Sequence, residues 1–191
     1  MSVAAVILAA GEARRFGSAK LVVPVDGVPL VRRAVLAALA VCTQVIVVTG
    51  AHRKPVESCI ADLAVERVFN AEWAEGLGGS IACGVAQLPS APGAAIILLA
   101  DQPLIGASEL RRLIDAHTRA PERIIAAQFS GTLGSPCLFP RSYFAELTSL
   151  HDTQGARVVL QRHADQVAAV VMPAAAFDID TPEDHERMMN S

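Results

Sequence analysis

The sequence predicts an α/β fold of the doubly wound type, in which helices flank a mainly parallel sheet and the second half adds a small β/α insertion. Short apolar runs, mostly continuous rather than alternating, recur along the first half of the chain and are typical of strands buried on both faces. Helix-like stretches separate these runs, and such alternation requires right-handed crossovers between parallel strands. With 191 residues, 52% of them apolar, the chain can form one domain with a sizeable core.

The predicted elements follow in order along the chain. Strands are expected at residues 3–10, 44–50, 66–70 and 94–101. Helices are expected at residues 30–41, 56–63, 80–88 and 108–119, the last with Ser108 as its N-cap. Residues 123–129 and 135–140 flank a turn-like stretch and predict a hairpin. Helices at 141–147 and 155–163, a strand at 165–172 and a C-terminal helix complete the prediction.

Composition and charge exclude several classes of protein. The net charge of −3 gives no general affinity for nucleic acid, so phosphate binding requires a local cluster of cations. The four cysteines lack the spacing of zinc ligands, which predicts buried thiols in a reducing compartment. The apolar run at residues 3–10 is short and is followed by basic residues, and no run reaches the ~18 residues of a membrane span. We therefore expect a cytoplasmic protein that binds neither membranes nor nucleic acid.

The loop after the first predicted strand carries the residues of a phosphate site. Gly11 and Gly17 let the backbone turn tightly and approach a ligand, while Arg14, Arg15 and Lys20 supply positive charge. Ligands of doubly wound sheets bind at the carboxyl ends of the strands, where this loop is expected. Its spacing matches neither a Walker A motif nor a GxGxxG fingerprint. The residues thus favour polyphosphate binding by another kind of loop, with an ordinary solvated turn as the alternative.

Carboxylates follow two further strand-like stretches. Asp101 directly follows an apolar strand, where a bare carboxylate is costly unless it meets a cation. Asp178 and Asp180 follow a short strand-like stretch near the C-terminus. Oxygen ligands of this kind suit Mg²⁺, which prefers one or two carboxylates together with waters and phosphates. For Asp178 and Asp180 the alternative is capping of the C-terminal helix.

Motifs spread over the whole chain carry a resemblance to a known family. In order they are LAAGEARRFGSAK, FNAEWAEGLGGSIACG, LLADQP, GSPCLF and DIDTPED. Together they resemble the MobA-like nucleotidyltransferases, and most of all the molybdenum cofactor cytidylyltransferase branch. The resemblance implies a Rossmann-like domain that binds a nucleoside triphosphate and Mg²⁺, with Mn²⁺ as an alternative metal. It implies transfer of CMP from CTP to the terminal phosphate of molybdopterin or the molybdenum cofactor, with release of pyrophosphate.

The same resemblance implies roles for individual residues. The catalytic positions are Arg14, Lys20 and Asp101, and the metal ligands are Asp101 and Asp180. Nucleotide binding falls to Leu8, Ala9, Ala10, Gly11, Arg14, Gly17, Lys20, Asn70, Gly76 and Ser80. Acceptor binding falls to Gln102, Pro103, Ser135, Asp152 and Arg157. Within a single domain, residues 1–127 would form the nucleotide-binding part, 128–172 a substrate-side insertion that binds the acceptor, and 173–191 the metal motif and last helix.

Local departures from the family pattern bear on the base and on the acceptor. Where the guanylyl branch resembles LAGG, this chain has Ala10, whose methyl group takes room that a purine would need. One methyl group discriminates by only ~1–3 kcal/mol, and here it favours CTP. Ala13 replaces a common Ser and Phe16 a common Met, but neither change removes a charge. Two further departures lie in the acceptor half: Ser135 stands where a His is frequent, and the stretch HDTQGAR differs from the usual family motif. They bear on the identity of the acceptor rather than on the nucleotide chemistry.

Other interpretations stay open at the level of sequence. A GTP-using molybdopterin guanylyltransferase and a sugar- or alditol-phosphate nucleotidyltransferase share the same loop chemistry. A chaperone that carries the molybdenum cofactor without turnover is a non-enzyme alternative, and an NAD-dependent oxidoreductase is disfavoured by the interrupted GxGxxG pattern. The product would pass to a molybdenum enzyme or its chaperone. Asn70 is equally well interpreted as a turn former, and Trp73 as a packed lid residue rather than a platform for a base.

Overall fold

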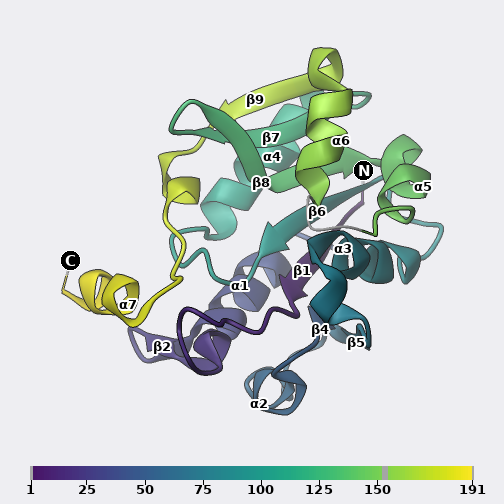
Figure 1. Ribbon diagram of the computed structural model, residues 1–191. Coiled ribbons are helices and arrows are strands. Elements are labelled where there is room, and N and C mark those ends of the chain that lie inside the picture. The colour runs from purple at the N-terminus through teal and green to yellow at the C-terminus, as the bar shows by residue number, and fades with distance from the viewer. Residues whose placement is uncertain (1, 152–154, 191) are drawn as a thin grey trace.

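The computed structural model describes residues 2–151 and 155–190. The strands found there are β1 (Val3–Ala9), β2 (Pro24–Val25), β3 (Val28–Pro29), β4 (Gln44–Thr49), β5 (Glu66–Phe69), β6 (Ala94–Leu99), β7 (Ile124–Phe129), β8 (Thr132–Pro140) and β9 (Val167–Val171). Within these residues, seven strands form one sheet in the order β5-β4-β1-β6-β8-β7-β9, and β2 and β3 form a small antiparallel ribbon (Figure 1).

The central sheet is parallel except at one strand. β1 pairs in parallel with β4 and β6, β4 with β5, and β7 with β9, whereas β8 runs antiparallel to β6 and β7. The predicted doubly wound, mainly parallel sheet is therefore confirmed. The predicted hairpin is confirmed as β7 and β8, although β8 begins at Thr132, earlier than expected, because Ser130 and Gly131 turn the chain with positive φ. This hairpin makes much of the segment after residue 128 part of the sheet, beside β6.

Helices connect the strands and cover both faces of the sheet. They are α1 (Leu30–Leu39), α2 (Arg53–Ser58), α3 (Leu77–Ala86), α4 (Ala107–Arg119), α5 (Phe144–Leu147), α6 (Ala156–Arg162) and α7 (Pro182–Met189). Short 3-10 helices are η1 (Lys20–Val22), η2 (Trp73–Glu75), η3 (Arg141–Tyr143), η4 (Ala164–Gln166) and η5 (Pro173–Ala176).

Several helix predictions were wrong in detail, and α3 also begins earlier than expected, at Leu77. The N-cap of α4 is Gly106 and not Ser108, because the Glu109 carboxylate accepts a hydrogen bond from the Gly106 N–H (3.0 Å) and closes the helix start two residues earlier. The helix expected at residues 56–63 is instead α2, which begins at Arg53 and ends at Ser58. Pro55 lies in its first turn, where a proline is tolerated because the N–H it lacks has no intrahelical partner there.

The core lies on both faces of the sheet, as continuous apolar strands require. Along β1, Val3, Ala5 and Ile7 belong to one buried cluster, while Val6 and Leu8 belong to the other. Helices α1 and α4 pack on the first face and α3 and α6 on the second (Figure 1). The prediction of strands buried on both faces is therefore confirmed.

The structure agrees with two expectations from the sequence, that the cysteines are free thiols and that the described helices do not span a membrane. The four cysteines are free thiols, of which Cys137 is buried and the others are partly buried. Burial raises the pKa of the Cys137 thiol to about 12. Across the part of the chain that the structure describes, the helices are too short or too polar to cross a lipid bilayer.

Candidate active site

The carboxyl ends of β1 and β6 lie side by side at the switch point of the sheet. The chain leaves β1 toward β4 on one side and later reaches β6 on the other, which is where doubly wound sheets bind ligands. Main-chain hydrogen bonds bring later segments to this edge, since Ala100 N–H donates to Leu8 O (3.2 Å) and Ile179 N–H donates to Asp101 O (3.0 Å). The loop after β1, the residues after β6 and the segment before α7 therefore meet.

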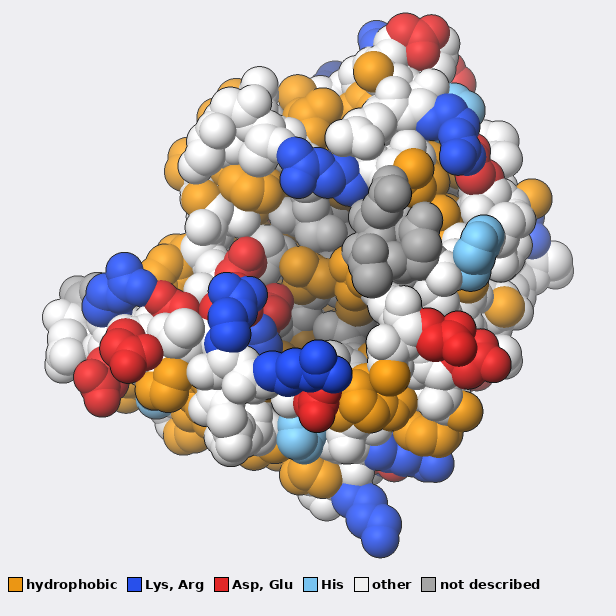
Figure 2. All heavy atoms as spheres, viewed as in Figure 1, with side chains coloured by type: hydrophobic (Ala, Val, Ile, Leu, Met, Phe, Trp, Pro, Cys, Tyr) orange, Lys and Arg blue, Asp and Glu red, His pale blue; other side chains and the backbone are white. Residues whose placement is uncertain are grey.

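A cavity of about 400 Å³, here the first cavity, opens at this junction. Charged side chains of both signs gather at the rim of a hollow on this face of the molecule (Figure 2). The walls of the cavity are Leu8, Ala10, Gly11, Ala13, Arg14, Arg15, Lys20, Leu21, Trp73, Gly76, Leu77, Ser80, Leu99, Asp101 and Asp180. Most of the predicted nucleotide and metal residues are thus brought together, but Ala9, Gly17 and Asn70 do not line it.

Lys20 is the centre of the charged side of the first cavity. Its ammonium donates to Asp101 Oδ2 at 2.7 Å and to Asp180 Oδ1 at 2.9 Å, and its side chain is 11% exposed. Arg15 donates to the other oxygen of Asp180 at 2.6 Å. Burial by itself lowers the pKa of Lys20, but the charges and hydrogen bonds of Asp101 and Asp180 outweigh it, so the pKa is raised. Lys20 is therefore a fixed cation between two carboxylates.

The two carboxylates have the chemistry of a magnesium site. Asp101 Oδ1 is buried without a hydrogen-bond partner, which leaves an acceptor free for a cation. No group of three or more His, Cys, Asp or Glu side chains gathers around a metal position among the described residues. A divalent ion here would therefore be held by Asp101 and Asp180 with phosphates and waters, the mode that Mg²⁺ prefers. The residues fit such an ion, and Lys20 now lies between the two carboxylates that would hold it.

The side chain of Asp180 takes no part in capping the last helix, because other residues do so. The N-cap of α7 is Thr181, whose hydroxyl accepts from Asp184 N–H at 3.2 Å. The Asp184 carboxylate in turn accepts from Thr181 N–H at 2.9 Å and from Asp180 N–H at 3.1 Å. Capping by Asp178 or Asp180 was therefore the wrong alternative, and Asp180 contributes only its main chain to the cap.

The loop after β1 presents Arg14 at the open rim of the first cavity. Arg14 is 83% exposed and donates through Nε to Glu12 Oε2 at 2.6 Å, and this carboxylate raises the pKa of Arg14. The amides of Phe16 and Gly17 both donate to Ala13 O, at 3.0 and 3.1 Å, so they close the loop rather than face a ligand. Gly17 has φ of +76° and supports this turn from outside the cavity. Contact of Arg14 with a triphosphate stays a prediction.

Asn70 does not line the first cavity but is hydrogen-bonded to Ser80, which does. Its Nδ2 donates to Ser80 Oγ at 3.0 Å, and its Oδ1 accepts from Glu72 N–H at 3.0 Å. Both residues are buried, and Ser80 lines the cavity from the second turn of α3, whereas Asn70 does not line it. The alternative of a turn former is therefore correct for Asn70, because its amide is used to fix the turn that leads to Trp73 and to hold Ser80.

Some wall residues were not expected from the sequence. Leu99 ends β6 two residues before Asp101, and the alternation of a strand could have placed both on one side. Leu77 begins α3 after Gly76, whose φ of 141° redirects the chain, and no local signal marks it as a wall. Trp73 lines the cavity and is more than a lid packed from outside.

A second cavity of about 280 Å³ adjoins the first and shares Leu8, Leu77 and Leu99 with it. Its further walls are Ile81, Ile97, Gln102, Phe129, Thr132, Leu133, Gly134, Ser135, Cys137, Ala156, Arg157, Leu160 and Asp178. The predicted acceptor residues Gln102, Ser135 and Arg157 therefore converge. Pro103 is buried and lines neither cavity, so the prediction that it contacts the acceptor is not supported by its position. Asp152 lies outside the described residues.

Gln102 shapes the second cavity through main-chain contacts. Its Nε2 donates to Ser135 O at 3.3 Å and to Ala175 O at 3.0 Å, and the residue is 5% exposed. It thereby joins the residues after β6 to β8 and to η5. The Ser135–Pro136 peptide bond on this wall is cis. The structure thus gives Gln102 a positioning part, and its contact with an acceptor stays a prediction.

Asp178 faces the second cavity, and its carboxyl group is expected to titrate well above the usual range of an aspartate. Desolvation by the cleft and the charge of Asp101 raise its pKa to about 6, against the hydrogen bond with Gln102. Because the folded value exceeds the unfolded one, its contribution to stability is present below pH 3.8 and is lost as the pH rises through about 6. A carbon-detected NMR titration in metal-free buffer should show this transition, and Asp101→Asn should move it to lower pH. An unchanged midpoint in that variant would contradict the role of the Asp101 charge.

Comparisons with known proteins place the chain in a family. A family model described as the MobA-like NTP transferase domain matches residues 5–167. The chain is 30% identical to the purine catabolism protein PucB of Bacillus subtilis, over 95% of this chain and 93% of that protein. It is also 30% identical to nicotine blue oxidoreductase of Paenarthrobacter nicotinovorans, over 98% of this chain and 96% of that protein.

Solved structures show the same fold. Rv0371c of Mycobacterium tuberculosis superposes over 100% of this chain and 99% of its own with a TM-score of 0.86 and 25% identity. Its complex with manganese superposes with a TM-score of 0.82, at 23% identity and over 100% of both chains. From the family match over most of the sequence, we conclude that the chain belongs to the MobA-like NTP transferase domain family.

Proposed function

We propose that the protein transfers CMP from CTP to the terminal phosphate of a molybdopterin-type acceptor and releases pyrophosphate. The observation that carries this proposal is the Lys20 ammonium held between Asp101 and Asp180, in a cavity that adjoins a second one. One cavity can take a triphosphate with its metal, and the other can take the acceptor. Two adjoining cavities suit a transfer between two ligands better than they suit storage of one.

The reaction needs positioning and charge neutralisation more than proton transfer. An oxygen of the acceptor phosphate attacks the α-phosphorus, the bond from that phosphorus to the oxygen bridging to the β-phosphate breaks, and pyrophosphate leaves with the bonding electrons. We assign Arg14 and Lys20 to the charge of the triphosphate. A phosphate nucleophile is already ionised at neutral pH, so no side chain has to act as a general base.

Asp101 and Asp180 would hold Mg²⁺, or Mn²⁺ as the alternative, in this proposal. Such an ion, when bound, supplies neutralisation of phosphate charge. The unpartnered Asp101 Oδ1 supports it, and so does the manganese complex of Rv0371c, which has the same fold. Lys20 is then expected to turn from the carboxylates toward the phosphates, because a divalent ion would neutralise the same two carboxylates that now hold its ammonium.

The base and the acceptor are assigned on separate observations. Ala10 lines the first cavity, where its methyl group reduces the room for a purine and supports CTP. The second cavity is mainly apolar and carries Arg157 and Ser135, a composition that suits a heterocycle with a phosphate arm. Residues 128–172 supply much of this wall, which supports their proposed acceptor-binding role within a single domain.

A second candidate function has one observation in its favour. Nicotine blue oxidoreductase resembles this chain over nearly its whole length, so an NAD-dependent reaction deserves a direct assay. The interrupted GxGxxG pattern of the loop after β1 argues against it. Oxidation of NADH or NADPH by the same preparation, with and without added substrates, tests this alternative beside the transferase assay.

The transferase assay measures pyrophosphate release with Mg²⁺, molybdopterin and one nucleotide at a time. We expect release with CTP and much less with GTP or ATP, and none when molybdopterin is omitted. Release with GTP alone would overturn the assignment of the base while keeping nucleotidyl transfer. Release from CTP with a sugar 1-phosphate in place of molybdopterin would overturn the acceptor. If no nucleotide supports release with either acceptor, the proposed transferase activity is wrong.

A further inference from the structure

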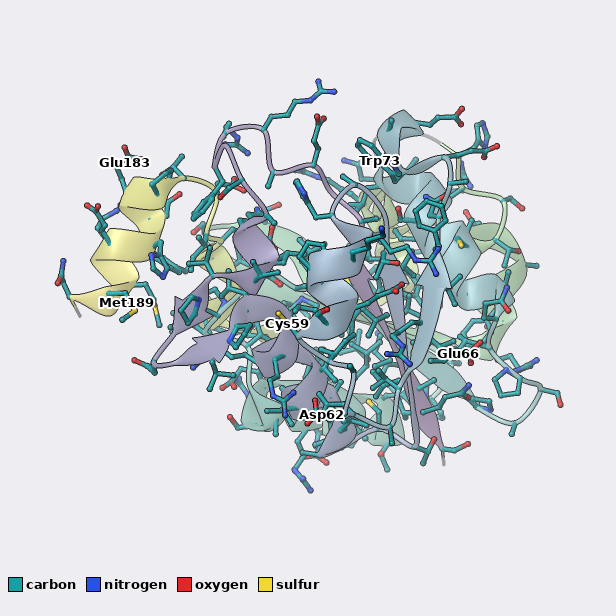
Figure 3. The ribbon with its side chains drawn as sticks, turned by 90° about the horizontal axis from the view of Figure 1, so that it is seen from below. Cys59, Asp62, Glu66, Trp73, Glu183 and Met189 are labelled. Atoms are coloured by element: carbon teal, nitrogen blue, oxygen red, sulfur yellow. The ribbon has the colours of Figure 1, made fainter. Side chains whose placement is uncertain are left out.

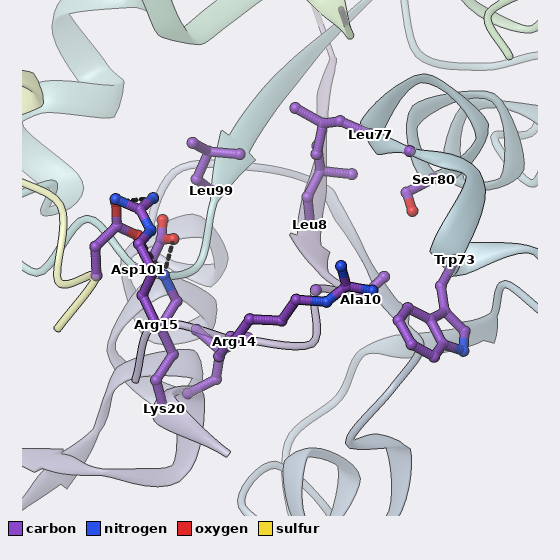
Figure 4. Close-up of a pocket in the computed structure, with 15 residues that line it drawn as sticks. Leu8, Ala10, Arg14, Arg15, Lys20, Trp73, Leu77, Ser80, Leu99 and Asp101 are labelled. Carbon is purple, nitrogen blue, oxygen red and sulfur yellow. Dashed lines mark hydrogen bonds and ion pairs between the residues drawn. The ribbon is translucent and has the colours of Figure 1, made fainter. Parts of the chain in front are cut away.

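The first cavity has two chemically different sides. Lys20 and Asp101 lie on one side of it, and Trp73 and Ser80 lie on the opposite side (Figure 4). A nucleoside triphosphate has the same division, with a polyanion at one end and a flat, largely uncharged base at the other. A ligand bound in this direction would place its base beside the Trp73 indole.

Trp73 packs beside Gly50, at the point where the chain leaves β4 and is hydrogen-bonded to the residue that follows β1. Gly50 directly follows β4, and the next amide, Ala51 N–H, donates to Ala10 O at 3.0 Å. A Cβ atom at Gly50 would lie 2.4 Å from Ala10 O and 2.7 Å from Trp73 Cβ. Real Cβ atoms do not approach so closely, so glycine is required for Ala10 and Trp73 both to pack against position 50.

The turn that carries Trp73 is fixed from a second side. Asn70 binds Ser80 through Nδ2 and the Glu72 N–H through Oδ1, which joins the turn to α3. The indole packs against the buried cluster that contains Leu8 and Ala10. We therefore expect the Trp73 side chain to keep its position when a larger ligand enters the cavity.

We propose that Trp73, held against Ala10 by Gly50, is the wall of the nucleobase subsite and restricts that subsite to a pyrimidine. This inference rests on the proposed nucleotidyltransferase function and adds a specificity-determining residue to it. A purine carries a second fused ring, and the indole with the Ala10 methyl group stands where that ring would extend. Removing the indole should enlarge the subsite on one side without touching Lys20, Asp101 or Asp180.

The first test uses the fact that Trp73 is the single tryptophan of the chain. Its emission therefore reports on this wall without a background from other tryptophans. We expect CTP with Mg²⁺ to change the intensity or wavelength of emission, with a midpoint equal to the dissociation constant from equilibrium dialysis. Binding of CTP in dialysis with unchanged emission would overturn the proposal and leave the proposed function intact. If CTP, GTP and ATP all fail to bind, the proposed function falls together with this inference.

The second test compares selectivity in Trp73→Ala and Trp73→Phe. We expect Trp73→Ala to raise the ratio of kcat/KM for GTP to that for CTP by about 10- to 100-fold, the range for a change of pocket size. Trp73→Phe, which keeps an aromatic wall, should stay near the wild-type ratio. Phe69→Ala is the matched control, because Phe69 is an exposed aromatic under Arg53 and lines neither cavity. An unchanged ratio in Trp73→Ala would overturn the proposal, even if total activity falls.

Discussion

Replacing Asp101 by Asn is expected to reduce pyrophosphate release by about a thousand-fold or more, the loss typical of removing a central electrostatic group. The amide keeps the shape of the carboxyl group but removes the charge that holds Lys20 at 2.7 Å. It also leaves one oxygen where the carboxylate has two, so the side chain can no longer offer one oxygen to Lys20 and a second, buried and unpartnered one to the metal. Steady-state pyrophosphate release at saturating CTP measures this loss, and circular dichroism checks that the fold is kept.

Asp62→Asn is the matched control for this experiment. Asp62 is also an aspartate paired with a cation, since it accepts from both terminal nitrogens of Arg32 at 2.6 and 2.7 Å. It lines neither cavity and lies far from Trp73 in the view from below (Figure 3). We expect its activity to remain within about two-fold of wild type, as for surface pairs in general. Equal losses in both variants would show that Asp101 acts through stability and not through the site.

Gly84→Ala is expected to lower the free energy of unfolding by about 2 kcal/mol, the balance of overpacking and the better helix propensity of Ala. A Cβ atom at Gly84 would lie 2.4 Å from Val6 Cγ1 and 2.7 Å from Val48 Cγ2. Both valines are fully buried in central strands, and β-branched side chains have few alternative rotamers. Helix α3 would have to move away from the sheet, and with it Ser80. Urea unfolding followed by circular dichroism measures the change.

Gly79→Ala is the control within the same helix. The nearest atom to a Cβ at Gly79 is Asn70 Nδ2 at 3.9 Å, an ordinary contact. This substitution should therefore leave stability unchanged or raise it by up to about 1 kcal/mol. Destabilisation by Gly79→Ala as large as that by Gly84→Ala would show that the close contact with β1 and β4 is not the cause.

The parts of the fold that were predicted correctly depend on local sequence. Continuous aliphatic runs such as residues 94–101 indicate a strand buried on both faces, because each side chain must meet an apolar neighbour. The N-cap of α4 was misplaced because Gly106 caps through its main chain and the Glu109 carboxylate, which a search for a polar cap side chain does not detect. The position of β8 between β6 and β7 was also not determined by its own residues, since strand order depends on packing between distant segments.

The sequence by itself determined the fold class and the chemical character of the site. Glycines and cations after an apolar strand, with aspartates after others, predict a phosphate and metal site because parallel strands end at a common edge. Only the tertiary structure decided how these groups meet. Lys20 binds carboxylates 81 and 160 positions away, and Trp73 and Ala10 both pack against Gly50. Such contacts depend on strand order and on the close packing of side chains far apart in the chain, and local patterns do not specify either.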